Sequence, residues 1–116
     1  MTTPKLVFAT GNAHKIAELE AILAPAYAGY EAGIIAKMSD FDAPEPVEDG
    51  ASFEENSLIK ARSLVKLTGL PAIADDSGLC VDILGGAPGI FSARWCGHHG
   101  DDAANLDLLL AQLADV

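Results

Sequence analysis

Near its N-terminus the chain reads Lys5-Leu6-Val7-Phe8-Ala9-Thr10-Gly11-Asn12-Ala13-His14-Lys15. The apolar run at 5–9 is typical of a buried strand, and the Thr-Gly-Asn cluster that follows it is typical of a turn. Beyond the turn, apolar residues recur at spacings of three and four, which predicts an amphipathic helix that ends at Pro25. The expected inward residues of this helix are Ile16, Leu19, Ile22 and Leu23.

Two further helices are expected along the chain. Ser52 and Glu55 form a capping-box pattern that predicts a helix start, and Gly69 predicts its end. The expected inward residues of that helix are Phe53, Leu58, Ala61, Leu64 and Val65. A final helix is expected to begin near Asp101 or Asp102, whose carboxylates favour a helix N-terminus. Its expected inward residues are Leu106, Leu109, Leu110 and Leu113.

Three more strands are expected between these helices. One lies around residues 33–36, a second at 71–74, and a third at 79–84, where the side chains alternate with the period of a strand. Strands that alternate with helices predict an α/β fold. A length of 116 residues suits one domain or one lobe of a larger fold, and we expect a single domain over residues 1–116.

The composition excludes several classes of protein. Of the 116 residues, 50% are hydrophobic, which is too many for an intrinsically disordered chain. The 7 Lys and Arg residues are outnumbered by 17 Asp and Glu, so neither nucleic acid nor an anionic membrane is an expected partner. The apolar runs are too short for a bilayer span, and the first residues lack the pattern of a signal peptide. Cys80 and Cys96 have no CxxC spacing and are expected to be reduced thiols, which predicts a cytoplasmic location.

The turn at residues 10–15 combines features of an anion-binding site. Gly11 allows the backbone to approach a phosphate, the following helix start presents N–H groups, and Lys15 adds a positive charge. The segment is neither a Walker A loop nor a GxGxxG turn. An ordinary strand-to-helix turn with a surface lysine explains the same residues.

Acidic residues offer ligands for a divalent cation. Asp75 and Asp76 follow the strand at 71–74. Two adjacent carboxylates repel one another, and a nearby cation relieves that repulsion. Mg²⁺ binds proteins through one or two such oxygens, so the pair predicts a metal site. The alternative explanation is an ordinary solvated turn. A second acidic segment at 45–49 precedes the Ser52-capped helix and is most simply a solvated loop. Lys60 on that helix could reach over a cleft or extend along the surface.

Four motifs occur in order along the chain. The first is Phe8-Ala9-Thr10-Gly11-Asn12-Ala13-His14-Lys15, and the second is Phe53-Glu54-Glu55-Asn56-Ser57-Leu58-Ile59-Lys60-Ala61-Arg62. The third is Ala74-Asp75-Asp76-Ser77-Gly78-Leu79, and the fourth is Leu84-Gly85-Gly86-Ala87-Pro88-Gly89-Ile90 with Ser92-Ala93-Arg94. Together they resemble the inosine/xanthosine triphosphate pyrophosphatase family. Because four motifs in series are specific, the chain is identified as a member of that family.

The resemblance implies an activity and a set of site residues. Members of the family hydrolyse noncanonical purine nucleoside triphosphates, such as dITP, ITP and XTP, to the monophosphate and pyrophosphate. Asp76 resembles the family's general base and Mg²⁺ ligand, Glu48 is the best match for a second metal-binding acid, and Asp75 resembles a supporting acid. The implied substrate contacts are Thr10, Gly11, Asn12, Ala13, His14, Lys15, Lys60 and Ser77.

The resemblance also implies a mechanism and an architecture. A water molecule oriented by Asp76 attacks the α-phosphorus, while Lys15 and Lys60 stabilise the departing pyrophosphate. The family fold has two lobes with a mixed central sheet flanked by helices, and we expect this chain to be its N-terminal portion. Two later family segments that hold the purine base, an aromatic-Gly-Tyr-Asp loop and a Ser-His-Arg motif, do not occur in it.

Family members are commonly homodimers, so a homodimer is also expected. Two alternatives remain beside the active enzyme. One is a catalytically inactive fragment that binds nucleotide or dimerises, and the other is a remnant that does not fold alone, with an exposed apolar face and an unpaired sheet edge.

Overall fold

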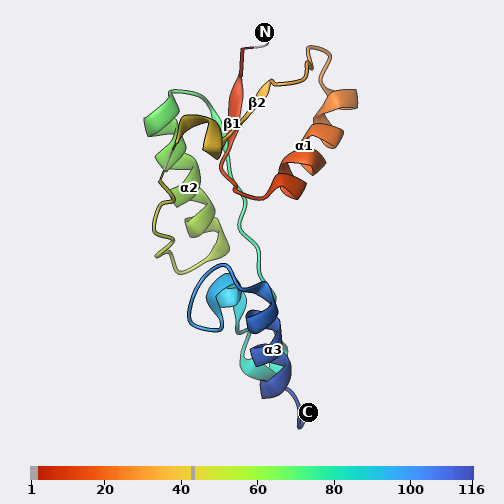
Figure 1. Ribbon diagram of the computed structural model, residues 1–116, viewed down its shortest axis with the longest axis vertical. Coiled ribbons are helices and arrows are strands. Elements are labelled where there is room, and N and C mark those ends of the chain that lie inside the picture. The colour runs from red at the N-terminus through yellow and green to blue at the C-terminus, as the bar shows by residue number, and fades with distance from the viewer. Residues whose placement is uncertain (1–2, 43) are drawn as a thin grey trace. The chain divides into compact units, whose positions relative to one another are not determined.

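The computed structural model describes residues 3–42 and 44–116, and contacts within the chain divide it into two compact units, Met1–Asp75 and Asp76–Val116. The strands and helices of the first unit are β1 (Leu6–Phe8), α1 (Ala13–Ala26), β2 (Ile35–Lys37), α2 (Phe53–Thr68) and β3 (Ala72–Ile73) (Figure 1). A short 3-10 helix, Met38–Phe41, follows β2. The second unit contains α3 (Asp102–Gln112) and two 3-10 helices, Asp82–Leu84 and Gly89–Arg94. The single domain expected from the chain length stays a prediction.

The first unit is built on a parallel sheet with the strand order β2-β1-β3. Leu6 is paired with Ile35 on one side of β1, and Val7 with Ala72 on the other. Because β2 and β3 lie on opposite sides of β1, the strand order reverses between β1 and β3, which makes this pair the topological switch point of the sheet. The α/β class expected from the sequence is therefore confirmed.

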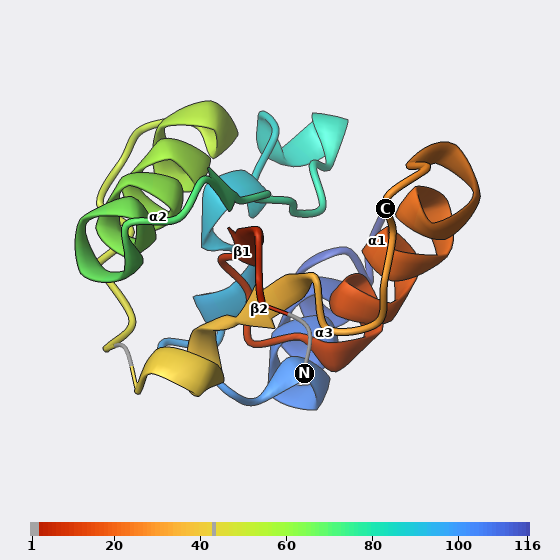
Figure 2. The same cartoon turned by 90° about the horizontal axis from the view of Figure 1, so that it is seen from above.

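Successive residues of β1 pack against different helices. Val7 packs with Leu64 of α2, whereas Phe8 packs with Ile16 of α1. This alternation is the geometry of a strand with both faces covered. Accordingly, α1 and α2 lie on opposite sides of β1 and β2 (Figures 1 and 2). The short strands are thus held between two helices, which fixes the direction in which their ends point.

The inward face of each helix is narrower than the apolar pattern predicts. Ile22 is 64% exposed, while Leu19 and Leu23 pack against the sheet beside Ile16. A helix turns by about 100° per residue, so Ile22 lies well away from the stripe formed by its neighbours, and a three-stranded sheet covers only that stripe. Leu58 and Val65 of α2 are exposed as well, and so are Leu106 and Leu110 of α3. Pro25 lies within α1, which ends one residue later, at Ala26.

The strand expected at residues 79–84 is wrong. In the described residues this segment forms one antiparallel bridge, between Cys80 and Pro88, and then the 3-10 helix Asp82–Leu84. Gly85 closes that helix in the left-handed conformation, with φ of 68°, so the chain turns back before a strand can extend. Every helix formed by residues 3–42 and 44–116 is too short or too polar to span a bilayer.

Candidate functional site

The carboxyl ends of β1 and β3 bring Lys15 and Asp75 together. The Ala9 N–H donates a hydrogen bond to the Ile73 carbonyl at 2.8 Å, so the two strand ends lie side by side. Lys15 Nζ lies 2.7 Å from Asp75 Oδ2, and both side chains are partly exposed. Ligands of open α/β sheets bind outside the carboxyl ends of the strands, at the switch point. This ion pair therefore marks the position in the first unit where a ligand is expected.

The turn at 10–15 is shaped by its own side chains. Thr10 Oγ1 accepts the Asn12 N–H at 3.1 Å, and Asn12 Oδ1 accepts the N–H groups of His14 and Lys15 at 2.9 and 3.4 Å. Asn12 is thus the N-cap of α1. Two of the helix N–H groups that the sequence suggested for phosphate binding are hydrogen bonded to Asn12 instead. The expected phosphate contact of Asn12 itself stays a prediction, as do those of Gly11 and Ala13.

A second ion pair joins the acidic loop to α2. Lys60 Nζ lies 3.0 Å from Glu48 Oε1, and the Lys60 side chain is the more buried of the two. The same loop reaches the turn after β1, because Glu45 Oε1 lies 3.8 Å from the position that a Cβ on Gly11 would occupy. Each lysine predicted to contact phosphate is therefore placed beside a carboxylate in the first unit.

The donor groups of this region fit a hard divalent cation. Among the described residues, Asp75 Oδ1 is a buried side-chain oxygen without a hydrogen-bond partner, and such an oxygen is unfavourable unless a donor or cation reaches it. No group of three or more His, Cys, Asp or Glu side chains in residues 3–42 and 44–116 is arranged to hold a metal. Mg²⁺ needs fewer protein ligands, since it commonly uses one or two carboxylates together with waters and substrate phosphate.

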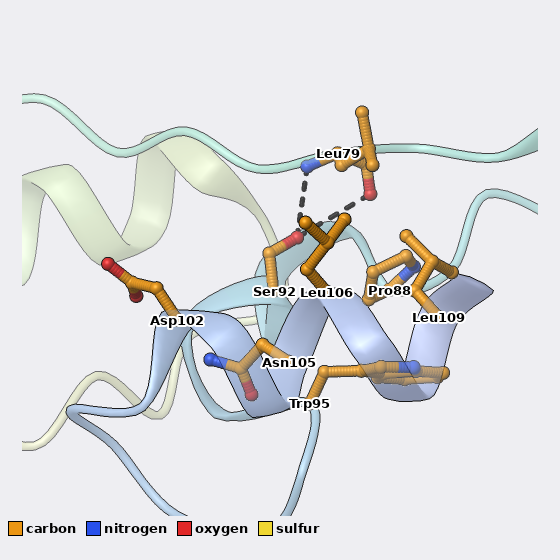
Figure 3. Close-up of a pocket in the computed structure, with 8 residues that line it drawn as sticks. All are labelled: Leu79, Pro88, Ser92, Trp95, Asp102, Asn105, Leu106 and Leu109. Carbon is orange, nitrogen blue, oxygen red and sulfur yellow. Dashed lines mark hydrogen bonds between the residues drawn. The ribbon is translucent and has the colours of Figure 1, made fainter. Parts of the chain in front are cut away.

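Asp76 and Ser77 open the second unit, where Asp76 is half-buried and Ser77 is exposed. Ser92 fastens the segment that follows them. Its Oγ accepts the Leu79 N–H at 2.9 Å (Figure 3). The same hydroxyl donates to the Gly89 carbonyl at 2.7 Å. The roles of Asp76 as general base and of Ser77 as substrate contact stay predictions.

The second unit also has a cavity of about 190 Å³. Its lining is mainly apolar, with polar atoms from the 3-10 helix and from α3 at its border (Figure 3). The residues that line it are Leu79, Pro88, Ser92, Trp95, Asp102, Asn105, Leu106 and Leu109.

Sequence reasoning did not assign a role to Asn56 or Gly50, which shape the loop that carries Glu48. The signal available was a polar residue, Asn56, inside the first turn of an amphipathic helix. Such a residue is neutral to unfavourable for helix formation, so its presence can indicate a tertiary contact.

Comparisons with known proteins agree with the motif resemblance. The sequence model of the Ham1 family matches residues 6–116. A dITP/XTP pyrophosphatase of Streptomyces avermitilis is 61% identical over 112 residues, which are 97% of this chain and 55% of that protein. A dITP/XTP pyrophosphatase of Streptomyces coelicolor is 59% identical over 116 residues, again 55% of its length. The chain therefore spans about half the length of the curated relatives that it matches.

Solved structures give the same result. The crystal structure of a nucleoside-triphosphatase / dITP/XTP pyrophosphatase from Mycobacterium abscessus matches with a TM-score of 0.76 at 53% identity, covering 96% of this chain and 56% of that one. A HAM1 protein from Coxiella burnetii matches with a TM-score of 0.82 at 38% identity, covering 97% and 54%. Because the sequence match runs from β1 through α3, this chain belongs to the Ham1 family.

Proposed function

We propose that this protein hydrolyses noncanonical purine nucleoside triphosphates, dITP, ITP and XTP, to the monophosphate and pyrophosphate. The observation that carries the proposal is the Lys15–Asp75 pair at the switch point between β1 and β3, with a nitrogen–oxygen distance of 2.7 Å. The printed names of the relatives, dITP/XTP pyrophosphatase, supply the substrate class.

The chain's own residues divide the work between binding and proton transfer. The ammonium groups of Lys15 and Lys60 bind phosphate oxygens and stabilise the charge that develops on the departing pyrophosphate. Asp75 and Glu48 hold these ammonium groups in place, at 2.7 and 3.0 Å, before the substrate arrives. The Asp76 carboxylate orients the attacking water and accepts its proton.

The motif resemblance, rather than a contact between the two units, supports Glu48 and Asp76 as the residues that would hold Mg²⁺. When bound, this cation would neutralise part of the negative charge on the phosphates. The ion pairs support this assignment, because Glu48 and Asp75 repel an approaching polyphosphate and offset part of the attraction by the lysines. A hard cation fits that carboxylate-rich environment.

The test is an assay of product release from ITP in the presence of Mg²⁺. We expect pyrophosphate rather than orthophosphate, and we expect Asp76→Asn to lower turnover by roughly 100-fold or more, because a positioned general base contributes about that much. Thermal unfolding of the variant should match that of the unsubstituted protein. Unchanged turnover in Asp76→Asn would show that the general-base assignment is wrong.

The alternative of a nucleotide-binding or dimerising chain without catalysis predicts a different result. Calorimetric titration with ITP and Mg²⁺ would then show binding, while the turnover assay would show no product. Nucleotide binding together with pyrophosphate release would support the enzymatic function over this alternative.

A further inference from the structure

The loop that carries Glu48 is attached to the start of α2 through a buried amide. Asn56, in the first turn of α2, is 3% exposed, and its Oδ1 accepts the Gly50 N–H at 2.9 Å. Asparagine is a poorer helix former than alanine, and a buried amide is unfavourable unless it is hydrogen bonded. The bond to Gly50 therefore accounts for a residue that helix formation alone does not explain.

The backbone at Gly50 passes directly against the helix. A Cβ at this position would lie 2.7 Å from both Asn56 Oδ1 and Glu55 Cβ, so a larger residue would displace the loop. The next residue is held as well, because Glu55 Oε2 accepts the Ala51 N–H at 2.7 Å. Ser52 Oγ accepts the Glu55 N–H at 3.1 Å, which completes the helix cap. Residues 50–52, here called the anchor segment, are thus fixed to the first turn of α2.

The same face of α2 carries the cation that Glu48 meets. Lys60 follows Asn56 by four residues, which places the two side chains on one face, about one helical turn apart. Glu48 lies just before the anchor segment in the chain, and its Oε1 is 3.0 Å from Lys60 Nζ. Because Gly50 is fixed by Asn56, the backbone that carries the Glu48 carboxylate is held close to Lys60.

We propose that Asn56 is a positioning residue for the polyphosphate site: it holds Glu48 against Lys60 without touching substrate or metal itself. The proposal rests on the proposed function, in which Glu48 holds Mg²⁺ and Lys60 contacts the triphosphate. Loss of the anchor lets the loop move away from α2. The affinity for the nucleotide with Mg²⁺ then falls, although both charged side chains are still present.

The test measures binding and local opening separately. Binding of the α,β-imido analogue of ITP with Mg²⁺ is measured by calorimetry, and amide exchange at Gly50 and Ala51 is measured by NMR. Asn56→Leu keeps a similar volume but removes the acceptor, so exchange at Gly50 should be faster. Binding should weaken about tenfold, the usual effect of removing a group that orients a metal ligand. Asn56→Asp retains an acceptor oxygen and should restore both properties.

A double-mutant comparison connects the effect to the carboxylate. Glu48→Gln should weaken binding by at least as much as Asn56→Leu. The double variant should bind no more weakly than Glu48→Gln alone, because both changes remove the same interaction. If the two changes lower the nucleotide affinity additively in the double variant, Asn56 does not act through Glu48. That result would overturn the proposal.

Asn105 provides a matched control in the second unit. It is also buried, and its Oδ1 accepts the Cys96 N–H at 2.8 Å. Asn105→Leu should lower the thermal unfolding temperature in the same way as Asn56→Leu. Amide exchange at Gly50 should remain as in the unsubstituted protein.

Each remaining outcome has a defined meaning. Normal nucleotide affinity in Asn56→Leu, with fast exchange at Gly50, overturns the positioning role and leaves the proposed function intact. Normal affinity in Glu48→Gln overturns the role of Glu48 in the proposed function, and the positioning proposal with it. If Asn56→Leu does not fold, Gly50→Ala displaces the same segment by its Cβ, and normal affinity in that variant overturns the proposal.

Discussion

Lys15 and Lys60 each lie beside a carboxylate that comes from a different element of the first unit. The nitrogen–oxygen distances are 2.7 Å to Asp75 and 3.0 Å to Glu48. Ion pairs at partly exposed positions contribute about 0.2–1 kcal/mol to stability, because water screens them and ordering two long side chains costs entropy. The two pairs therefore add little to the free energy of folding, and their main consequence is the placement of two ammonium groups.

Substitutions in the Lys15–Asp75 pair should have opposite effects on ligand binding. Asp75→Asn should bind the α,β-imido analogue of ITP more tightly without Mg²⁺, because it removes a negative charge beside the lysine. Lys15→Met should bind it more weakly. Both should change the free energy of unfolding by less than about 1 kcal/mol, since the pair is partly exposed. Calorimetry and chemical denaturation measure these changes, and weaker metal-free binding by Asp75→Asn would contradict the assumed repulsion.

Helix starts are the elements that shape the first unit's candidate site. Asn12 caps α1 at the end of the turn that follows β1, and Ser52 caps α2 shortly after the acidic loop. Both caps accept backbone N–H groups that have no partner within the helix. One of the two hydrogen bonds of the predicted capping box is confirmed, since Ser52 Oγ accepts the Glu55 N–H. The Glu55 carboxylate accepts the Ala51 N–H instead of the Ser52 N–H. Each helix is therefore tied to the loop that carries predicted ligand-binding residues.

The cap of α1 allows two roles of Asn12 to be separated. Asn12→Ala should lower the free energy of unfolding by about 1 kcal/mol, because the cap is lost. Asn12→Asp should retain that stability, since a carboxylate also caps a helix and favours its N-terminus. If Asn12 contacts phosphate, the added charge should weaken Mg²⁺–nucleotide binding about tenfold. Denaturation and calorimetry check the two parts, and normal binding by Asn12→Asp would remove Asn12 from the substrate contacts.

The whole chain consists of two units with different degrees of burial, and it spans about half the length of its relatives. The first unit contains both buried apolar clusters formed by the described residues. In the second unit, Leu79 and Leu106 line a cavity of about 190 Å³ and remain 54% and 53% exposed. Apolar surface is therefore left in water there. The homodimer and the cytoplasmic location expected from the sequence stay predictions.

This exposed apolar surface should bind a fluorescent apolar probe. We expect 1-anilinonaphthalene-8-sulfonate to fluoresce with the native protein, because Leu79 and Leu106 form part of an accessible apolar cavity. Leu106→Asp should reduce that signal with little change in unfolding temperature, since the side chain is half exposed. Ile22→Asp, at an exposed position on α1, is the control and should leave the signal unchanged. Equal fluorescence in all three proteins would contradict the assignment of the probe site.

Local chemistry explains which features could be predicted from the sequence. Several predicted features depend on residues only a few positions apart, and the structure contains them. They are the strand–helix alternation of the first unit, the Ser52 cap, the Gly69 stop and the start of α3 at Asp101 or Asp102. The family motifs also lie within short segments. Such signals are readable because turns, caps and hydrophobic periods act over one or two helical turns.

Contacts between distant segments required the folded chain. The Lys15–Asp75 pair exists because β3 adds to the side of β1 opposite β2, and hydrophobic periodicity does not encode strand order. The bond between Asn56 and Gly50 likewise depends on how a loop packs against α2. Residues 79–84 have a strand's alternation but form a bridge and a 3-10 helix, because a strand also needs a neighbour to accept its hydrogen bonds.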